Sequence, residues 1–542
     1  MSKEKDHQRG LNRRDFMKAT GGAAAMAGIA AGGIFVNPGK ARAYALPEKW
    51  DHEADVVIIG FGGAGACAAI EAADAGASVI ILEKSPVPGG STAISGGIVY
   101  AAGTSVQKKA GVEDNAEEMF KYLKACGQGI ADEKLLIVAS DMSAENIEWM
   151  IRLGAEFTTE LLAVSGMEQI TEYSSITPAK PRGHRCKGTG GAFFNALKKA
   201  VEARKIEVMT RTEALRPIIV SSDTSSSEIV GIQANRGGKN IHILARKAVI
   251  LATGGIMASD KTKSWLQDYS PDLARCVPAG DINATGDGYR IGMNCGAALA
   301  GMNKGALLPC VMLPGLRMAG IVYVNIWGLP NLYVDKSGKR FADESAYYVL
   351  VCEEMIKKEA FQAFCVFDSH TVAKALELIP RGIEKTRTLA LGIDPEKLDE
   401  GVQRGYLWKG RNADELASNM KISPDVLKKT ITDFNAAAVS GKDNEFGRTK
   451  NLVPLNAPPY YAFAIHLGMV AHGGGLKINE RAQVLDTFDQ VIPRLYAAGR
   501  DSIGIMGGRY PGSGAALSCF LTFGRIAGRN ATAEKELTKL ST

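Results

Sequence analysis

Short runs of apolar residues that end at glycines predict the strands of a buried parallel sheet. Such runs occupy residues 56–59, 79–82 and 248–251, and the last of them carries no polar residue on either face. A strand that is apolar on both faces is typical of the centre of a parallel sheet covered by helices. Residues 55–101 are therefore expected to form a strand, a helix, a second strand and a loop.

The rest of the chain alternates between helical and strand patterns. Helical periodicity covers residues 116–153, 192–203, 427–439 and 515–527, whereas strands are expected at 206–208, 215–220 and 229–232, with residues 221–227 as a hairpin loop. The middle of the chain mixes strands with charged helices, and the nucleotide-binding pattern resumes at residues 490–499. The predicted fold class is α/β: a Rossmann-like domain with an inserted α+β capping domain. Its expected divisions are 1–43, 51–300, 301–461 and 462–542.

The first strand leads into three glycines with a spacing that suits a dinucleotide. Gly60 permits the tight turn, Gly62 allows the main chain to approach a pyrophosphate, and Gly65 allows the helix to pack on the strand. The positive end of the helix dipole then faces the phosphates. Glu83 ends the second strand, where it can accept hydrogen bonds from ribose hydroxyls. A glycine-rich turn without a ligand is the alternative, but such a turn has no need of Glu83.

The basic charge of the chain is concentrated in its first 43 residues. The whole sequence of 542 residues has a formal charge of +6, but these residues hold eight Lys or Arg against three acids, which leaves +1 for the remainder. The balance of the remainder gives no reason to expect nucleic acid as a partner. Arg13 and Arg14 precede a Gly/Ala-rich run and the small-residue cleavage pattern Ala41–Ala43. This segment resembles a twin-arginine export signal and predicts a periplasmic or otherwise extracytoplasmic protein.

The main competing interpretation of this segment is a membrane anchor, for which the run is poorly apolar. No later segment has the apolar length of a membrane span, so none is expected in the mature chain. The nine cysteines are dispersed and contain no C-x-x-C pair, which argues against covalent haem, an iron–sulfur cluster or structural zinc. No metal site is predicted.

Five separated segments resemble the flavoprotein family of fumarate reductase and succinate dehydrogenase, which includes urocanate reductases and 3-ketosteroid dehydrogenases. These segments are 89–97, 252–255, 283–288, 495–499 and 510–514. The resemblance implies non-covalent FAD and a capping domain inserted into the FAD domain. The expected cofactor-binding residues are Gly60, Gly62, Gly63, Ala64, Gly65, Glu83, Lys84, Gly90, Ser91, Thr92, Ser95, Gly96, Gly97, Ala252, Thr253, Gly254, Asp287, Gly499, Arg500, Ala515 and Leu517.

One position departs from the family pattern. Many relatives have Glu after the Tyr-Ala-Ala-Gly turn, where it contacts ribitol, but Arg500 stands here. The helix that begins after Gly514 is expected to direct its N-terminus at the flavin N1–C2=O edge. A partial positive charge there stabilises the anionic reduced flavin.

The catalytic residues implied by the resemblance are Tyr510, Gly514 and Tyr348. The Tyr510–Gly514 segment resembles the Y-P-G-x-G of ketosteroid dehydrogenases, in which the tyrosine hydroxyl and the last glycine N–H hold the substrate's ketone oxygen. Tyr348 matches the tyrosine that exchanges the proton on the α-carbon. Where dicarboxylate reducers place an arginine–aspartate pair, this chain has Tyr347 and Tyr348.

The sequence therefore favours an exported FAD-dependent oxidoreductase that reduces, or forms, a C=C bond conjugated to a carbonyl. A ketosteroid-like enone is the preferred substrate, and a separate electron donor is expected. The alternative is a reductase of an unsaturated carboxylate such as fumarate, urocanate or an arylacrylate, with Arg509 and His472 as clamps. There are two other interpretations. The first is that Tyr347, Tyr348 and Tyr510 are only packing residues, and the second is that the protein is a flavin carrier without a substrate of its own.

Overall fold

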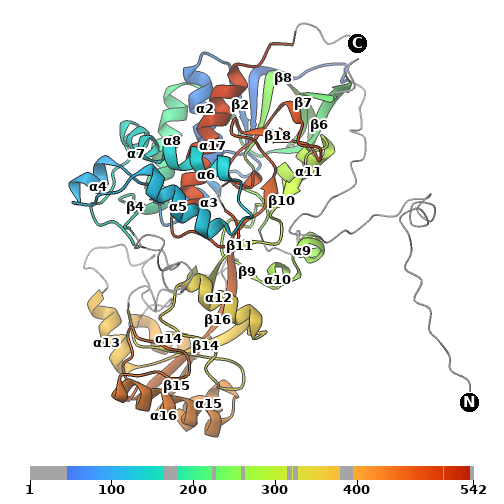
Figure 1. The fold of residues 1–542 in the computed structure, drawn as a ribbon. Coiled ribbons are helices and arrows are strands. Elements are labelled where there is room, and N and C mark those ends of the chain that lie inside the picture. The colour runs from blue at the N-terminus through green and yellow to red at the C-terminus, as the bar shows by residue number, and fades with distance from the viewer. Residues whose placement is uncertain are drawn as a thin grey trace, which may run out of the picture.

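The protein has two lobes joined by a narrower waist in the computed structural model (Figure 1). The structure describes residues 46–163, 180–221, 227–257, 263–313, 320–321, 328–378, 395–504 and 506–537. The predicted export signal lies outside these residues. In Figure 1 the upper lobe contains α2, α17 and the strands β2 and β8, and the lower lobe contains β14, β15 and α13 to α16.

The larger lobe is built on a sheet in the order β18-β19-β8-β1-β2-β5. Its strands are β1 (His52–Ile59), β2 (Val79–Leu82), β5 (Glu207–Met209), β8 (Lys239–Leu251), β18 (Gln483–Leu485) and β19 (Val491–Ala497). In this order the pairs from β19 to β5 are parallel, and β18 runs antiparallel to β19 at the edge. The apolar run 248–251 lies between β1 and β19, so the prediction of a central strand is confirmed.

Helices cover this sheet, and two of them pack on each other at glycines. They include α2 (Gly63–Asp74), α8 (Thr189–Ala203) and α17 (Ala515–Thr532). A Cβ on Gly528 of α17 would lie 2.3 Å from the Ala68 carbonyl oxygen of α2. The two helices therefore approach at main-chain distance, which holds the C-terminal helix against the first β-α unit.

Smaller elements surround the sheet. The hairpin predicted around residues 221–227 is present as β6 (Thr212–Ser221) and β7 (Ser227–Arg236), and β7 also pairs with β8. The single helical region expected at 116–153 is three helices, because Asp132 starts a new helix with its side chain as the N-cap. These and the neighbouring elements are α3 (Gly90–Ala93), β3 (Ile98–Tyr100), α4 (Ser105–Lys109), α5 (Ala116–Gly127), α6 (Glu133–Asp141), α7 (Ser143–Arg152), β4 (Gly183–Arg185), α9 (Lys263–Tyr269), α10 (Pro271–Ala274), α11 (Asp287–Asn294), β10 (Leu299–Ala300), β17 (Gly475–Leu476) and η3 (Gly499–Asp501).

The smaller lobe has a separate sheet in the order β12-β11-β16-β14-β13, to which β15 and β9 add by pairing with β16. Its elements are β9 (Val277–Pro278), β11 (Gly305–Val311), β12 (Gly320–Ile321), β13 (Leu332–Val334), α12 (Tyr348–Lys357), β14 (Gln362–Asp368), α13 (Ser369–Leu378), η2 (Pro395–Lys397), α14 (Leu398–Gln403), β15 (Leu407–Gly410), α15 (Ala413–Met420), α16 (Pro424–Ser440) and β16 (Tyr460–His472). Strand β16 continues past the boundary expected at residue 461, because it pairs with β11 as far as His472.

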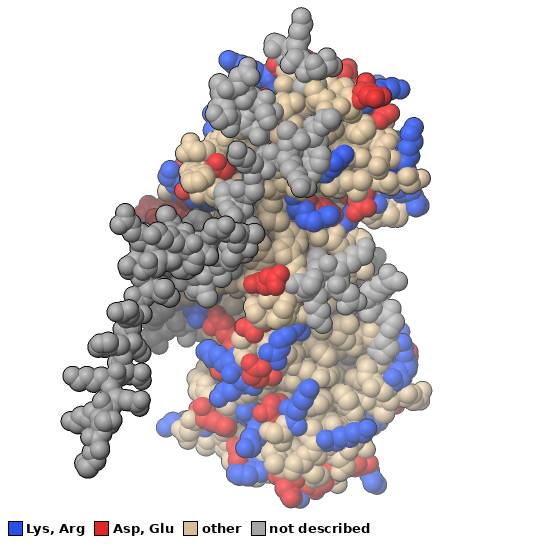
Figure 2. Space-filling view, turned by 90° about the vertical axis from the view of Figure 1, so that its right-hand side faces the viewer, with Lys and Arg blue, Asp and Glu red and all other residues tan. Residues whose placement is uncertain are grey.

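The surface of the molecule mixes both signs of charge. Figure 2 shows basic and acidic side chains interspersed on the face that it presents. The near-neutral balance of the sequence after residue 43 is thus reflected in the arrangement of charges on that face.

Candidate functional site

The turn after β1 requires glycine at its first position. Gly60 has φ +104°, and a Cβ there would lie 2.3 Å from the Ala252 carbonyl oxygen. This close approach arises because β1 and β8 are parallel neighbours that end side by side, with Ile59 opposite Leu251. Helix α2 then begins at Gly63 without a side-chain cap. The Gly63 N–H donates to Thr92 Oγ1 at 3.2 Å, and the rest of this first turn is available to a ligand's anionic group.

Glu83 at the end of β2 holds the loops around this turn. One carboxylate oxygen accepts from Phe61 N at 2.9 Å and the other from Ser85 N at 2.7 Å. Burial raises the pKa of Glu83, and these two hydrogen bonds oppose the rise. Next to it, Lys84 Nζ lies 2.6 Å from Asp287 Oδ2, so the Lys84 charge is neutralised.

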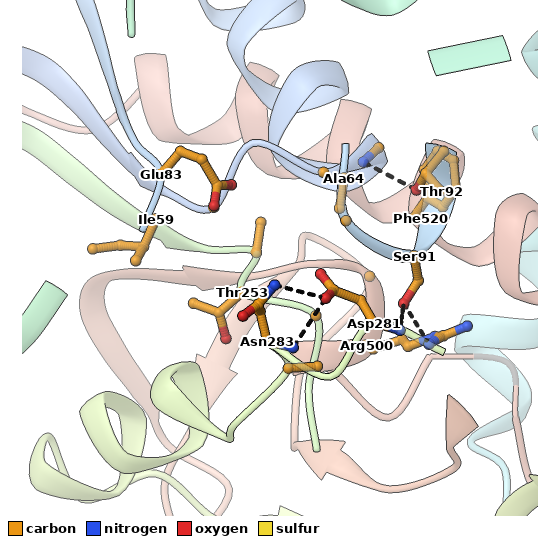
Figure 3. Close-up of a pocket in the computed structure, with 18 of the residues that line it drawn as sticks. Ile59, Ala64, Glu83, Ser91, Thr92, Thr253, Asp281, Asn283, Arg500 and Phe520 are labelled. Carbon is orange, nitrogen blue, oxygen red and sulfur yellow. Dashed lines mark hydrogen bonds between the residues drawn. The ribbon is translucent and has the colours of Figure 1, made fainter. Parts of the chain in front are cut away.

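A pocket with about 930 Å³ of empty space runs along the carboxyl ends of these strands. Figure 3 shows Glu83 and Arg500 on opposite sides of it, with Thr253, Asp281 and Asn283 along its wall. The predicted cofactor residues that line it are Gly60, Gly62, Gly63, Ala64, Glu83, Lys84, Gly90, Ser91, Thr92, Ala252, Thr253, Gly254, Asp287, Gly499, Arg500 and Leu517.

The other five predicted cofactor residues lie outside the pocket wall. A Cβ on Gly65 would lie 2.0 Å from the Gly60 carbonyl oxygen, and one on Gly97 would lie 2.4 Å from the Thr189 carbonyl carbon. Ser95 Oγ instead donates to Thr92 O at 2.8 Å. Ala515 is fully buried at the start of α17, and the nearest neighbour of a Cβ on Gly96 would be Ile98. These residues allow close packing or shape the loops behind the pocket.

Three polar residues of the pocket wall were not predicted: Thr212, Asp281 and Asn283. Asp281 and Asn283 lie just before α11, and Asp281 Oδ1 accepts from the Asn283 main chain at 2.9 Å. The main-chain N–H of Asp281 donates to Ser91 Oγ at 3.1 Å. The nearness of Asp281 and Asn283 in sequence to the glycine turn at 283–288 is the signal that could have identified these two.

Asp501 holds the main chain after β8 on the far side of the pocket. Its carboxylate accepts from Thr253 N, from Thr253 Oγ1 at 2.9 Å and from Gly255 N at 2.9 Å. The carboxylate is completely buried, and burial raises its pKa to about 6. Asp501 therefore orients the turn after β8 and does not itself face the pocket.

This shift predicts a pH-dependent stability. Since the folded pKa is above the unfolded value of 3.8, Asp501 contributes most below pH 4, and its contribution falls as pH rises to about 6. In denaturant titrations of the holoprotein, we expect the stability advantage of the wild type over Asp501→Asn to shrink by about 3 kcal/mol between pH 4 and pH 7. A difference that does not change with pH would contradict the assignment.

Three phenols from the two lobes meet beside the start of α17. Tyr347 and Tyr348, at the start of α12, pack with Tyr510. Tyr347 Oη donates to Tyr348 Oη at 3.1 Å, and their ring centroids are 4.3 Å apart. Burial raises the pKa of Tyr348 and of Tyr347. All these hydroxyls therefore stay protonated near neutral pH.

Tyr510 is held at the N-terminus of α17. Its hydroxyl accepts from Ala516 N at 3.4 Å, and Ala516 lines the pocket. Burial raises the pKa of Tyr510, while hydrogen bonds from the main chain of Ala516 and Gly514 oppose the rise. Gly514 has φ +106°, and a Cβ there would lie 2.7 Å from Tyr100 N. The structure thus brings Tyr348, Tyr510 and Gly514 together, as the sequence analysis expected.

The two residues predicted to clamp a carboxylate substrate, Arg509 and His472, have hydrogen-bond partners within the protein. Arg509 donates through Nε and Nη2 to the Glu353 carboxylate, at 2.7 and 3.0 Å. His472 is fully buried, with Nε2 2.8 Å from Met302 O and Nδ1 3.4 Å from Gly474 O. Burial lowers the pKa of His472, which favours the neutral ring. Both ring nitrogens of His472 face main-chain carbonyls, and its contact with a substrate stays a prediction.

All nine cysteines are buried and free. Among the described residues, no group of three His, Cys, Asp or Glu side chains is arranged to hold a metal ion. Within the same part of the chain, no helix combines the length and apolar character that crossing a bilayer requires.

Comparisons with known proteins agree with this geometry. Residues 55–517 match the FAD binding domain family, and residues 10–30 match the twin-arginine translocation pathway signal sequence. The chain is 31% identical over 498 residues to fumarate reductase (cytochrome) of Shewanella frigidimarina, covering 90% of this chain and 79% of that protein. It is 28% identical over 575 residues to digoxin reductase of Eggerthella lenta, covering 97% and 98%.

A solved structure extends the likeness to the fold. The 3-ketosteroid-delta4-(5alpha)-dehydrogenase of Rhodococcus jostii, in complex with 4-androstene-3,17-dione, superposes with a TM-score of 0.69 at 27% identity. The alignment covers 91% of this chain and 99% of that one.

The residues present fit FAD. The first turn of α2, the turn at Gly60 and Glu83 suit a dinucleotide, and the pocket continues to Arg500 on its other side. The expectations of FAD and of twin-arginine export are both confirmed by the family matches. The chain therefore belongs to the FAD-binding family of the fumarate reductase and succinate dehydrogenase flavoproteins, oxidoreductases that act on carbon–carbon bonds.

Proposed function

We propose that this exported flavoprotein reduces a carbon–carbon double bond conjugated to a ketone, with a ketosteroid-like enone as substrate. The observation that carries the proposal is the meeting of Tyr348 and Tyr510 beside the start of α17. Neutral phenol donors suit a ketone oxygen, whereas an acid substrate calls for cationic partners.

Tyr510 and Tyr348 have separate roles in the proposed reaction. FAD, once bound and reduced by the separate electron donor, would supply the hydride to the β-carbon and return to its oxidised form. Tyr510 accepts a hydrogen bond from Ala516 N, so its own O–H can be donated to the ketone oxygen. The Gly514 N–H, which is directed at the Tyr510 hydroxyl in the free site, would turn to the same ketone oxygen when the substrate binds. These donors would stabilise the negative charge that develops on that oxygen. Tyr348 delivers the proton to the α-carbon and takes a proton in return from the hydroxyl of Tyr347, whose oxygen lies 3.1 Å away.

The alternative substrate, an unsaturated carboxylate, has less support from the arrangement of the site. The Arg509 charge is already opposed by Glu353, and His472 is occupied by main-chain carbonyls. Using either residue as a clamp would require breaking these hydrogen bonds inside partly buried surroundings. The direction of reaction is proposed as reduction because export separates the protein from cytoplasmic acceptors and because several relatives are reductases.

A substrate panel tests the proposal. The FAD-loaded protein is reduced with viologen, and reoxidation is followed with a 3-keto-4-ene steroid, fumarate, urocanate and cinnamate. We expect turnover with the steroid and at least tenfold less with each acid. Turnover confined to the acids would overturn the enone assignment in favour of the carboxylate reductase.

A further inference from the structure

Arg500 brings to the pocket wall a positive charge that forms no ion pair with any described residue, although the Asp281 carboxylate of the same wall acts on it electrostatically. It lies in η3 directly after β19 and lines the pocket opposite Glu83 (Figure 3). Among the described residues, the only hydrogen-bond partner of its guanidinium is Ser91 Oγ at 3.3 Å, and no carboxylate lies within ion-pair distance. Lys84, the other cation of the wall, is neutralised by Asp287 at 2.6 Å.

The main chain of Arg500 is firmly held. Its carbonyl oxygen lies 2.9 Å from Tyr289 Oη, whose one O–H it shares with Gly474 O at 2.6 Å. A Cβ on Gly255 would lie 2.6 Å from the Arg500 carbonyl oxygen. The neighbouring Asp501 carboxylate binds Thr253 and Gly255. With its backbone fixed on three sides, Arg500 can serve as a preorganised charge that needs no rearrangement when a ligand binds.

A second positive feature lies close to this guanidinium. Helix α17 begins after Gly514 with the Tyr510 hydroxyl accepting from Ala516 N at 3.4 Å, and its residues Ala516 and Leu517 line the pocket with Arg500. The N-terminus of a helix carries a partial positive charge. Burial lowers the pKa of Arg500, and the nearby Tyr510 opposes that change, but a guanidinium stays charged at any ordinary pH.

We infer that Arg500 sets the redox potential of the bound flavin by favouring its negatively charged reduced form over the neutral oxidised form. A guanidinium fixed beside a cofactor interacts with added negative charge far more than with a neutral ring. The role rests on the FAD that the family match assigns and is independent of the identity of the enone.

Redox titration of the FAD-loaded protein tests the inference. We expect Arg500→Gln to weaken the binding of reduced relative to oxidised flavin about tenfold, which lowers the two-electron midpoint potential by about 30 mV. Arg500→Lys keeps the charge and should stay near the wild-type potential, and Arg500→Glu should lie lowest. Arg236→Gln is the matched control, because it removes the same charge from an exposed position on the same lobe.

The pH dependence of the potential gives an independent readout. If the wild type stabilises the anion, its potential changes by about 30 mV per pH unit near neutrality, because one proton accompanies two electrons. In Arg500→Gln the slope should approach about 59 mV per pH unit over the same range. Equal potentials and slopes in wild type, Gln and Glu variants would overturn the inference, whatever the substrate panel shows. If Arg500→Gln loses its flavin, two other measurements decide the inference: the midpoint potential of Arg500→Lys relative to the wild type, and the pH dependence of the wild-type potential.

Discussion

Replacing Tyr510 with Phe is expected to lower kcat on an enone by about 10²- to 10³-fold, the usual cost of one oxyanion-stabilising donor. The change removes the hydroxyl that accepts from Ala516 N and leaves the ring, which packs against Tyr347 and Tyr348. Steady-state turnover with reduced viologen measures the effect. FAD content and the rate of flavin reduction by viologen should stay at wild-type values, because the hydroxyl acts on the substrate oxygen.

Tyr333→Phe provides the matched control. Tyr333 is a buried tyrosine of β13 that stacks on Phe341 with ring centroids 6.3 Å apart, away from the phenols at α17. We expect it to retain wild-type turnover. Full enone activity in Tyr510→Phe would instead agree with the interpretation of Tyr510 as a packing residue.

The second large effect is expected from Gly60→Ala, which should yield protein without FAD. Alanine at φ +104° is strained, and its Cβ would lie 2.3 Å from the Ala252 carbonyl oxygen, so the turn and the end of β8 must move apart. That movement displaces the start of α2 from the position suited to a pyrophosphate. The ratio of flavin absorbance at the visible maximum to protein absorbance measures the loss.

Gly76→Ala is the control that separates the effect of backbone strain from the effect of a steric clash. Gly76 also has a positive φ, +86°, but a Cβ there would meet no atom within 4 Å. We expect it to keep a full complement of FAD and to lose about 1 kcal/mol of stability from the left-handed backbone alone. If Gly60→Ala purified with stoichiometric flavin, the close approach of the turn to β8 would not be what positions the cofactor.

Local pattern was sufficient for the first half of the site. The strand ending at Ile59, the glycine turn and the acid at Glu83 are neighbours through one β-α-β unit, so their arrangement follows from short-range rules of parallel sheets. The same holds for the central position of residues 248–251, which an unbroken apolar run already requires. The three-helix division of 116–153 was missed because the periodicity continues across the cap at Asp132.

The substrate side depended on contacts between distant segments. Tyr348 and Tyr510 are far apart in sequence and meet only because the start of α12 packs against the start of α17. The roles of Arg509 and His472 were decided by partners that no local pattern reveals, Glu353 and the main chain at Met302. Asp281 entered the pocket wall in the same way, through Ser91.

The amino-acid sequence by itself determined the class of protein: an exported FAD enzyme with a parallel sheet and an inserted segment, because strands, turns and signals are encoded by neighbouring residues. Only the tertiary structure decided which charges are free to act. A cation is chemically available only when no acid lies beside it, and that pairing is set by three-dimensional packing. Arg509 forms an ion pair with Glu353, whereas Arg500 forms none with a described residue. The two residues are both arginines and lie only nine positions apart, so the sequence alone does not distinguish them.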